Sequence, residues 1–470
     1  MKSKVIDEEL AWKNRVFETI NAKEILMKSI RFDLIYKFLY VKNKNEPTSP
    51  FYKDIYLKSI KAFNNFYEKE PYKSGPEDFL NSFDALIESI HINGFDNNKS
   101  LITVTSSDDL YDGAHRICIA ANQNLDLEMG VGELPTYFNY KFFIDNGLPH
   151  WLADLGAYEF TKSSEYAYIA TLHSSVPNEK INEIEALFSQ SGKIYYKKEI
   201  DLSFEGYVNL KKLSYQGNKW IGSQSNNYEG ATKHAEKSFG SNPLRVYVLI
   251  YDDIEILNKT KNSVRDLCGI GNFSIHITDN REESISLARY LLNNSSISFW
   301  SNVDTNFNFD KPENHISKFK SLLNKNGSNT ENFCIVGSYS LSLFGIRQAR
   351  DLDYIFIDNS CSISSTEIDN HGHEDELYFG KTINQILDPR CYFYLYGIKF
   401  INLPSLLIYK SRRNEYPKDT NDIGYILDHI NSSINNFATK AKIEPYYNFS
   451  KGILVLLKKI YAFFRKLTSN

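Results

Sequence analysis

Two aspartates, Asp351 and Asp353, stand two positions apart at the start of an apolar run, in the segment Asp-Leu-Asp-Tyr-Ile-Phe. Alternate side chains of a strand point to the same face, so a strand here places both carboxylates side by side. Two neighbouring carboxylates repel each other unless a cation lies between them. Oxygen ligands suit Mg²⁺ or Mn²⁺, which keep other coordination positions for water or phosphate. The pair therefore predicts a divalent-metal site.

A glycine–serine turn, Gly337-Ser338, ends the preceding apolar run of residues 333–336. Glycine lets the backbone approach a ligand closely, and the N–H groups at the start of a following helix favour a phosphate. The order predicted from these residues is strand, turn, short helix, strand. The turn is expected to hold phosphate groups beside the metal.

Residues 318–430 resemble the nucleotidyltransferase superfamily, which includes the CCA-adding enzymes, the kanamycin nucleotidyltransferases and the minimal MNT proteins. The likeness is carried by the apolar strand, Gly-Ser, a short gap and Asp-x-Asp. Gly345-Ile346-Arg347 is also similar to the CCA-adding subgroup. However, Ser340-Leu341-Ser342 stands where that subgroup has Val-Arg-Asp, so a tRNA-end activity is not expected.

This resemblance implies in-line transfer of a nucleotidyl group from a nucleoside triphosphate, with Asp351 and Asp353 as catalytic ligands of Mg²⁺ or Mn²⁺. The family's third carboxylate is assigned to Asp388, at the end of the predicted strand 381–388; its alternative role is a cap before Pro389. Sugar- and drug-type members have a similar helical segment with Lys-x-x-Arg, followed by Lys-Asp-x-x-Asp-Ile. The residues assigned to nucleotide binding are Gly337, Ser338, Arg347, Lys410, Arg413 and Lys418. The alternative for the lysines is an exposed helix face.

A second candidate site is the segment Asp112-Gly113-Ala114-His115-Arg116, between a predicted strand at 101–104 and a predicted helix at 114–122. A glycine at such a turn, followed by arginine, suits an anion. Residues 79–138 resemble the ParB/sulfiredoxin-like superfamily, which implies nucleotide binding by Asp112, Gly113, His115 and Arg116. Ala114 replaces the reactive cysteine of sulfiredoxins, and no basic helix-turn-helix follows. The alternative is a salt-bridged arginine with a capping aspartate.

The middle of the chain alternates strands and helices, which predicts an α/β layer. Strands are predicted at 166–172, 193–197, 244–251, 273–277 and 296–300. Its polar residues include Lys233, His234, Lys261, Arg265, His276 and Asp279. Together they suit a phosphorylated or sugar ligand, but sequence spacing does not show that they converge. Solvated lysines and buried histidines are the alternative.

The length of 470 residues predicts a multidomain α/β (α+β) protein. The expected units are a helical and ParB-like region (1–160), an α/β region (161–305), a transferase-like region (306–448) and a basic amphipathic helix (449–470). Helices are expected over 8–42, 52–69 and 77–92, and a boundary over 303–313. The net charge of −4 shows no basic field, so nucleic acid is not an expected partner.

Five scattered cysteines without CxxC spacing indicate a reducing cytoplasm rather than a disulfide or zinc scaffold. The first nine residues hold no apolar signal core, and no apolar run reaches 18 residues. Residues 452–467 mix apolar side chains with lysines and arginines, as helices on an anionic membrane surface do. A location at the inner face of the membrane follows, unless this helix docks on the protein itself.

These features lead to one main hypothesis, a metal-dependent nucleotidyl- or phosphotransferase that acts on a small hydroxyl or sugar acceptor. A role in building bacterial surface polysaccharide fits two nucleotide-type motifs and a membrane-surface helix. The alternative is a ParB-like nucleotide-sensing regulator, or an antitoxin-like protein with a non-catalytic transferase fold.

Overall fold

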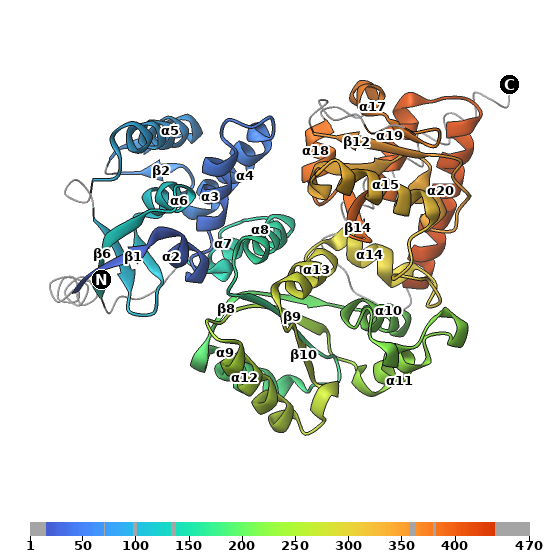
Figure 1. Cartoon of the computed structure of the whole chain (residues 1–470), viewed down its shortest axis with the longest axis horizontal. Coiled ribbons are helices and arrows are strands. Elements are labelled where there is room, and N and C mark those ends of the chain that lie inside the picture. Colours follow the sequence, from blue (N-terminus) through green and yellow to red (C-terminus); the bar gives the residue numbers. More distant parts are fainter. Residues whose placement is uncertain are drawn as a thin grey trace.

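The computed structural model describes residues 16–69, 71–96, 101–132, 138–357, 363, 365–378 and 382–437, without the side chains of 373, 375 and 431–437. The predicted C-terminal amphipathic helix lies outside these residues. Figure 1 shows an N-terminal part in blue, a middle part in green and a C-terminal part in orange. The protein is α/β, with about 54% helix and sheets of mixed and antiparallel strands. Among the described residues, no helix is long and apolar enough to cross a membrane.

The first sheet has the strand order β1-β6-β4-β5. Its strands are β1 (Val16–Asn21), β6 (Asp126–Gly132), β4 (Ile102–Thr105) and β5 (Leu110–Asp112). The prediction of helix throughout residues 8–42 is wrong over β1, because Val16 to Asn21 pair antiparallel with β6. β-branched and aromatic side chains there favour a strand. The helices of this part are α2 (Ala22–Lys28), α3 (Leu34–Asn43), α4 (Ser49–Asn64), α5 (Pro76–Asn93) and α6 (Ala114–Asn122). A small hairpin, β2 (Tyr67–Glu68) and β3 (Lys73–Ser74), lies between α4 and α5.

The second sheet is antiparallel, in the order β10-β7-β9-β8. Its strands are β7 (Ala167–Leu172), β8 (Lys193–Ile200), β9 (Leu244–Ile250) and β10 (Ile275–Ile277). Side chains of β9 alternate between two cores. Tyr247 and Leu249 pack with α9 (Ile181–Ser191) and α12 (Ile254–Cys268). The main core receives Leu244, Val246, Val248 and Ile250. The other helices here are α10 (Phe204–Ser214), α11 (Glu229–Ser238) and α13 (Arg281–Leu291).

The strand predicted at 296–300 is wrong, because residues Asn294–Asn302 form helix α14. Asn293 caps it, since its side chain accepts a hydrogen bond from the backbone N–H of Ser296. The buried residues Ser296, Phe299 and Trp300 have the i, i+3, i+4 spacing of one helix face.

The third sheet is mixed, in the order β13-β12-β11-β15-β14. Its strands are β11 (Phe333–Val336), β12 (Leu352–Phe356), β13 (Ile368–Asn370), β14 (Tyr392–Leu395) and β15 (Ile398–Ile401). The helices around it are α15 (Asn314–Lys325), α16 (Tyr339–Leu343), α17 (Gly372–Tyr378), α18 (Thr382–Leu387), α19 (Leu403–Arg413) and α20 (Lys418–Phe437). The order strand, turn, short helix, strand predicted for residues 333–356 is confirmed.

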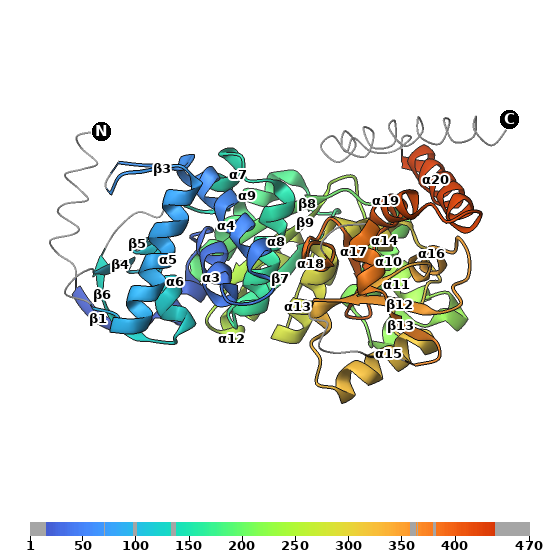
Figure 2. The ribbon, with the colours of Figure 1, turned by 90° about the horizontal axis from the view of Figure 1, so that it is seen from above.

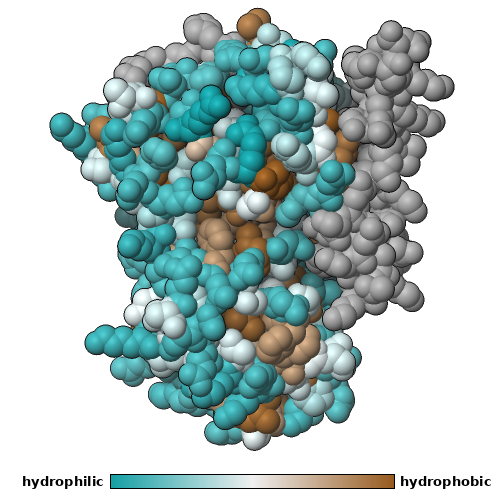
Figure 3. All heavy atoms as spheres, turned by 90° about the vertical axis from the view of Figure 1, so that its right-hand side faces the viewer, coloured by the Kyte–Doolittle hydropathy of each residue, from teal (hydrophilic) through white to brown (hydrophobic). Residues whose placement is uncertain are grey.

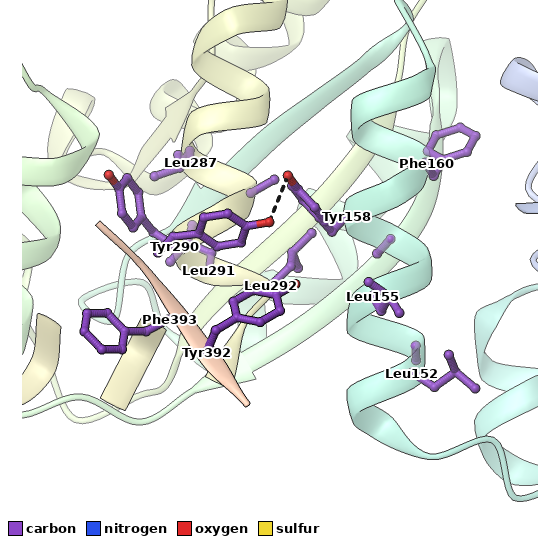
Figure 4. Close-up of a cluster of buried hydrophobic side chains, with 14 of the residues drawn as sticks. Leu152, Leu155, Tyr158, Phe160, Leu287, Tyr290, Leu291, Leu292, Tyr392 and Phe393 are labelled. Atoms are coloured by element: carbon purple, nitrogen blue, oxygen red, sulfur yellow. Dashed lines mark hydrogen bonds between the residues drawn. The ribbon is translucent and has the colours of Figure 1, made fainter. Parts of the chain in front are cut away.

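Helix α8 (His150–Ser163) joins the three parts, together with the short helix α7 (Tyr140–Asp145). Figure 4 shows Tyr158 of α8 and Tyr290 of α13 beside Tyr392 of β14 in one buried cluster. One continuous core includes residues from all three sheets. Figure 2 shows the same arrangement from above, with α8 and α13 in the middle.

A carboxylate at this junction binds side chains of several elements. Glu331 accepts hydrogen bonds from Tyr158 (3.1 Å), Tyr394 (2.7 Å) and Arg289 (3.0 Å) and lies 3.2 Å from Lys399. Burial opposes the charge of Glu331, but the neighbouring cations outweigh it and hold the pKa of this carboxyl far below its usual range.

The segment 303–313, expected to be a domain boundary, is held against the middle part. Lys212 of α10 donates hydrogen bonds to the carbonyl oxygens of Thr305 (2.8 Å) and Phe307 (2.5 Å). Phe309 in this segment is buried. In Figure 3, apolar residues gather along the waist between the upper and lower parts of this face.

Candidate active site

The predicted site lies at the point where β11 ends and β12 begins. The two strands are antiparallel, and Val336 is opposite Asp353. Gly337 follows at φ +69°, a conformation that favours glycine. A methyl group on Gly337 would come within 2.4 Å of Oδ2 of Asp353. The carboxylate of Asp353 therefore lies directly against the glycine–serine turn.

Asp351 and Asp353 flank Leu352 at the start of β12, Asp351 exposed and Asp353 largely buried. Strand β13 runs parallel to β12 and places Asp369 opposite Asp353. Residues opposite each other share a face of the sheet, so Asp369 is a third carboxylate at this edge. Burial raises the pKa of Asp353, His371 opposes this rise, and Asp351 and Asp369 add to it. Such repulsion is what a bound cation would relieve.

The donor set fits Mg²⁺ or Mn²⁺ bound together with a phosphorylated substrate. Among the described residues, no three His, Cys, Asp or Glu side chains converge closely enough to hold a metal alone. Mg²⁺ is commonly held by one or two carboxylates, with water and substrate phosphates completing its shell. Asp351 and Asp353 would supply those carboxylates.

Two further residues beside Asp353 were not assigned from the sequence. Nε2 of His371 lies 3.2 Å from Asp353, and Nδ1 lies 3.1 Å from Glu374 at the start of α17. The sequence showed His371 only as a histidine in a polar stretch without periodicity. Asp369 belongs to a three-residue strand, which is too short to predict from alternation.

The cations assigned to nucleotide binding are mostly engaged with helix α20. Buried Lys410 lies between Asp419 (3.1 Å) and Asp422 (2.7 Å). Arg347 donates to both oxygens of Asp422, at 2.6 and 2.8 Å. Arg413 contacts Asp419 at 2.8 Å. These ion pairs fasten α19 and the turn after α16 to α20.

Lys418 is the assigned cation that remains exposed. The Lys418 ammonium lies 3.9 Å from the carboxylate of Glu415. Its positive charge lowers the pKa of Asp353, so it lies within electrostatic reach of that carboxylate. Of the cations assigned to a triphosphate, Lys418 is the best placed.

Asp388 does not lie on a strand, so that prediction is wrong. Residues Thr382–Leu387 form helix α18, and Asp388 follows its end. Its carboxylate accepts hydrogen bonds from the Arg390 side chain (2.6 Å) and the Arg390 backbone N–H (2.9 Å). Pro389 cannot extend a ladder of strand hydrogen bonds. The role left open for Asp388, a cap at this turn, agrees with its contacts.

The second predicted site, at Gly113, forms the expected strand-to-helix turn, with φ +95° at the glycine. Arg116 donates to Asp112 (3.1 Å) and to the carbonyl oxygen of Leu101 (3.3 Å). His115 lies 3.1 Å from the hydroxyl of Tyr56, and burial holds its pKa well below its usual range. Arg116 is therefore salt-bridged, and Asp112 makes no capping bond.

No protein-family model, no curated protein and no solved structure matches this chain. The site is therefore interpreted from its own geometry.

Proposed function

We propose that the C-terminal part is a metal-dependent nucleotidyltransferase that acts on a small hydroxyl or sugar acceptor. The contact between Gly337 and the carboxylate of Asp353 is the main support. It brings a phosphate-type turn and a metal-type carboxylate together, beside Asp351 and Asp369. A carboxylate in a structural ion pair does not require a glycine with a positive φ directly against it.

In the proposed reaction, the acceptor oxygen bonds to the α-phosphorus of a nucleoside triphosphate while the bond to pyrophosphate breaks. Gly337 and Ser338 would bind the phosphates through backbone N–H groups, and Lys418 would add positive charge. The carboxylate of Asp369 is exposed and makes no hydrogen bond to another described residue, so it would accept the hydroxyl proton. A metal held by Asp351 and Asp353 would neutralise charge on the phosphates and the leaving group.

The test is pyrophosphate release from each of the four NTPs with Mg²⁺, in the presence of sugar and polyol acceptors. Asp353→Asn should lower turnover by about 10²–10³-fold, since a lost metal carboxylate removes several kcal/mol of charge stabilisation. Asp388→Asn is the matched control, because Asp388 only binds the Arg390 turn. Equal turnover in Asp353→Asn and the unmodified protein would overturn the proposal.

The engaged cations support a second function, a nucleotide-sensing regulator without transfer chemistry. Lys410, Arg347 and Arg413 are all paired with carboxylates, so few positive charges remain for a triphosphate. A regulator would bind a nucleotide in a calorimetric titration and would release no pyrophosphate in this assay at any acceptor concentration.

A further inference from the structure

A separate hollow of about 580 Å³ opens in the middle part of the chain. It lies among the end of α10 and the loop after it, α11, α12, β10 and the start of α13. None of its lining residues comes from the C-terminal part. Its volume lies within the range of ligand pockets, about 300–1,000 Å³.

The lining gathers positive charge from two helices. Lys233 and Lys237 come from α11, and Lys261 and Arg265 come from α12. Three of these four cations, Lys233, Lys261 and Arg265, were singled out from the sequence without evidence that they converge. The other three residues singled out there, His234, His276 and Asp279, line the pocket as well. The structure therefore shows the convergence that sequence spacing did not.

Only part of this charge is neutralised within the pocket. Lys261 donates to Asp279 (3.0 Å) and to the carbonyl oxygen of Ile277 (2.9 Å). Exposed Lys233 pairs with Glu229. The side chains of Arg265 and Lys237 have no ion pair or hydrogen bond to another described residue, although the Lys237 ammonium lies 5.1 Å from the ring of Phe273. Nε of Arg265 is buried without a hydrogen-bond partner. A buried guanidinium N–H without an acceptor is unfavourable, and an anion in the pocket would supply one.

Histidines add uncharged donors at the base of the pocket. His276 is only 5% exposed, and its Nε2 lies 3.1 Å from the carboxylate of Glu283. His234, also buried, lies against the ring of Tyr215. Both residues line the pocket, so their imidazole rings form part of its polar surface.

Aromatic rings form one wall. Trp220, 44% exposed, lies with its ring centroid 4.9 Å from Tyr215 and 5.3 Å from His234. Phe273 lies on the other side of His234, at 4.9 Å. An exposed indole beside free cations suits a ligand with a flat or ring-shaped body and an anionic end.

We propose that this pocket binds an organic phosphate, with Arg265 and Lys237 pairing with the phosphate and Trp220 contacting the organic group. Guanidinium groups bind phosphate through two parallel hydrogen bonds. The organic group can be a nucleobase or a sugar, because each offers a ring to Trp220 and can carry a phosphate for Arg265 and Lys237. The proposal is independent of any transfer reaction at Asp351 and Asp353.

The test is calorimetric titration of the full chain with AMP, ADP, a hexose phosphate and inorganic phosphate. Arg265→Met and Lys237→Met should each weaken binding at least tenfold, since each removes a charged hydrogen bond to the phosphate. Lys259→Met is the matched control, because Lys259 is an exposed lysine of α12 outside the pocket. Lys237 is exposed, so its replacement does not endanger folding.

Tighter binding of AMP and ADP would identify a nucleobase, and tighter binding of the hexose phosphate would identify a sugar. In either case Trp220→Ala should weaken binding of the preferred ligand. The Asp353→Asn variant should bind this ligand with the affinity of the unmodified protein. The proposal is overturned if inorganic phosphate binds as tightly as every organic phosphate. It is also overturned if Lys259→Met weakens binding as much as Arg265→Met, or if Asp353→Asn abolishes it.

Discussion

The edge of the third sheet and the pocket of the middle part both gather cations, but they use them differently. Beside Asp351 and Asp353, Lys410 and Arg347 are paired with carboxylates of α20. In the middle pocket, Arg265 and Lys237 have no described carboxylate partner. A position near a motif therefore does not by itself show that a positive residue binds a ligand. The cations left unpaired by the fold are the better candidates.

The largest expected effect on stability separates these two kinds of cation. Lys410→Met should destabilise the fold by about 3–5 kcal/mol, because it leaves the carboxylates of Asp419 and Asp422 buried without their lysine. Arg265→Met should leave stability unchanged within about 0.5 kcal/mol, as a change without a lost partner does. Urea unfolding of both variants measures the difference. Equal losses would show that Arg265 is as structural as Lys410.

A glycine substitution tests how closely the turn and the carboxylate depend on each other. Gly337→Ala should cost about 1–3 kcal/mol and lower pyrophosphate release at least tenfold, because its methyl group would meet Asp353 at a positive φ. Gly327→Ala is the control, since Gly327 also has a positive φ but open space around it. Its cost should be confined to stability. Equal loss of activity in both variants would remove the special role of the Gly337 contact.

A fall in pH should lower the stability of the middle part and of the C-terminal part in different pH ranges. Burial lowers the pKa of His173 and His276, and it lowers that of His234 to about 4. The unfolded chain then binds more protons than the folded one, so stability in this part falls as pH drops from about 6.5 towards 4. Groups facing these histidines are Lys211, Lys237, Lys261, Arg265 and Glu283.

The C-terminal ion pairs should persist through that range. Arg413 and Lys410 outweigh burial and lower the pKa of Asp419 to about 2, so the stability it contributes is lost only as pH falls from about 4 towards 2. Hydrogen exchange followed region by region at pH 7, 5 and 3.5 measures the order. Loss of protection in α20 before α11 and α12 would contradict this expectation.

The smallest expected change concerns Arg116 at the Gly113 turn. This cation is neither unpaired, like Arg265, nor bound to buried carboxylates, like Lys410. Arg116 is paired, but its partner Asp112 is exposed. Arg116→Ala should therefore lower stability by no more than about 1 kcal/mol, as exposed salt bridges do. A melting curve compared with that of Asp112→Asn measures it. A much larger loss in the arginine variant alone would indicate that its bond to the Leu101 carbonyl carries most of the stability.

Local patterns predicted the parts of the fold that depend on neighbouring residues. Helix α6 begins and ends where its apolar spacing indicated, at Ala114 and Asn122. The turn at Gly337 and the strand that begins after Asp351 were also predicted, because both lie within the single segment 333–356. By contrast, α14 and α18 were predicted as strands, because three apolar residues within a segment of five to eight residues do not distinguish a strand from a buried helix.

Long-range pairing explains what was missed at the sites. Asp369 reaches Asp353 only because β13 pairs with β12 in one register. The middle pocket depends on elements from α10 to α13, which the sequence separates by tens of residues. The residue types were visible, but the packing that brings them together was not.

The carboxylate of Glu331 has a practical consequence for how this protein can be divided. It is bound by Tyr158 and Arg289 from the earlier parts of the chain and by Tyr394 from the third sheet. A fragment ending at residue 305 would keep Arg289 and lose its acceptor. A fragment starting at 306 would keep Glu331 and lose two of its donors. Cutting the chain at the apparent boundary would thus create two surfaces with unmatched charge, and each half would be inclined to aggregate or to bind the other again.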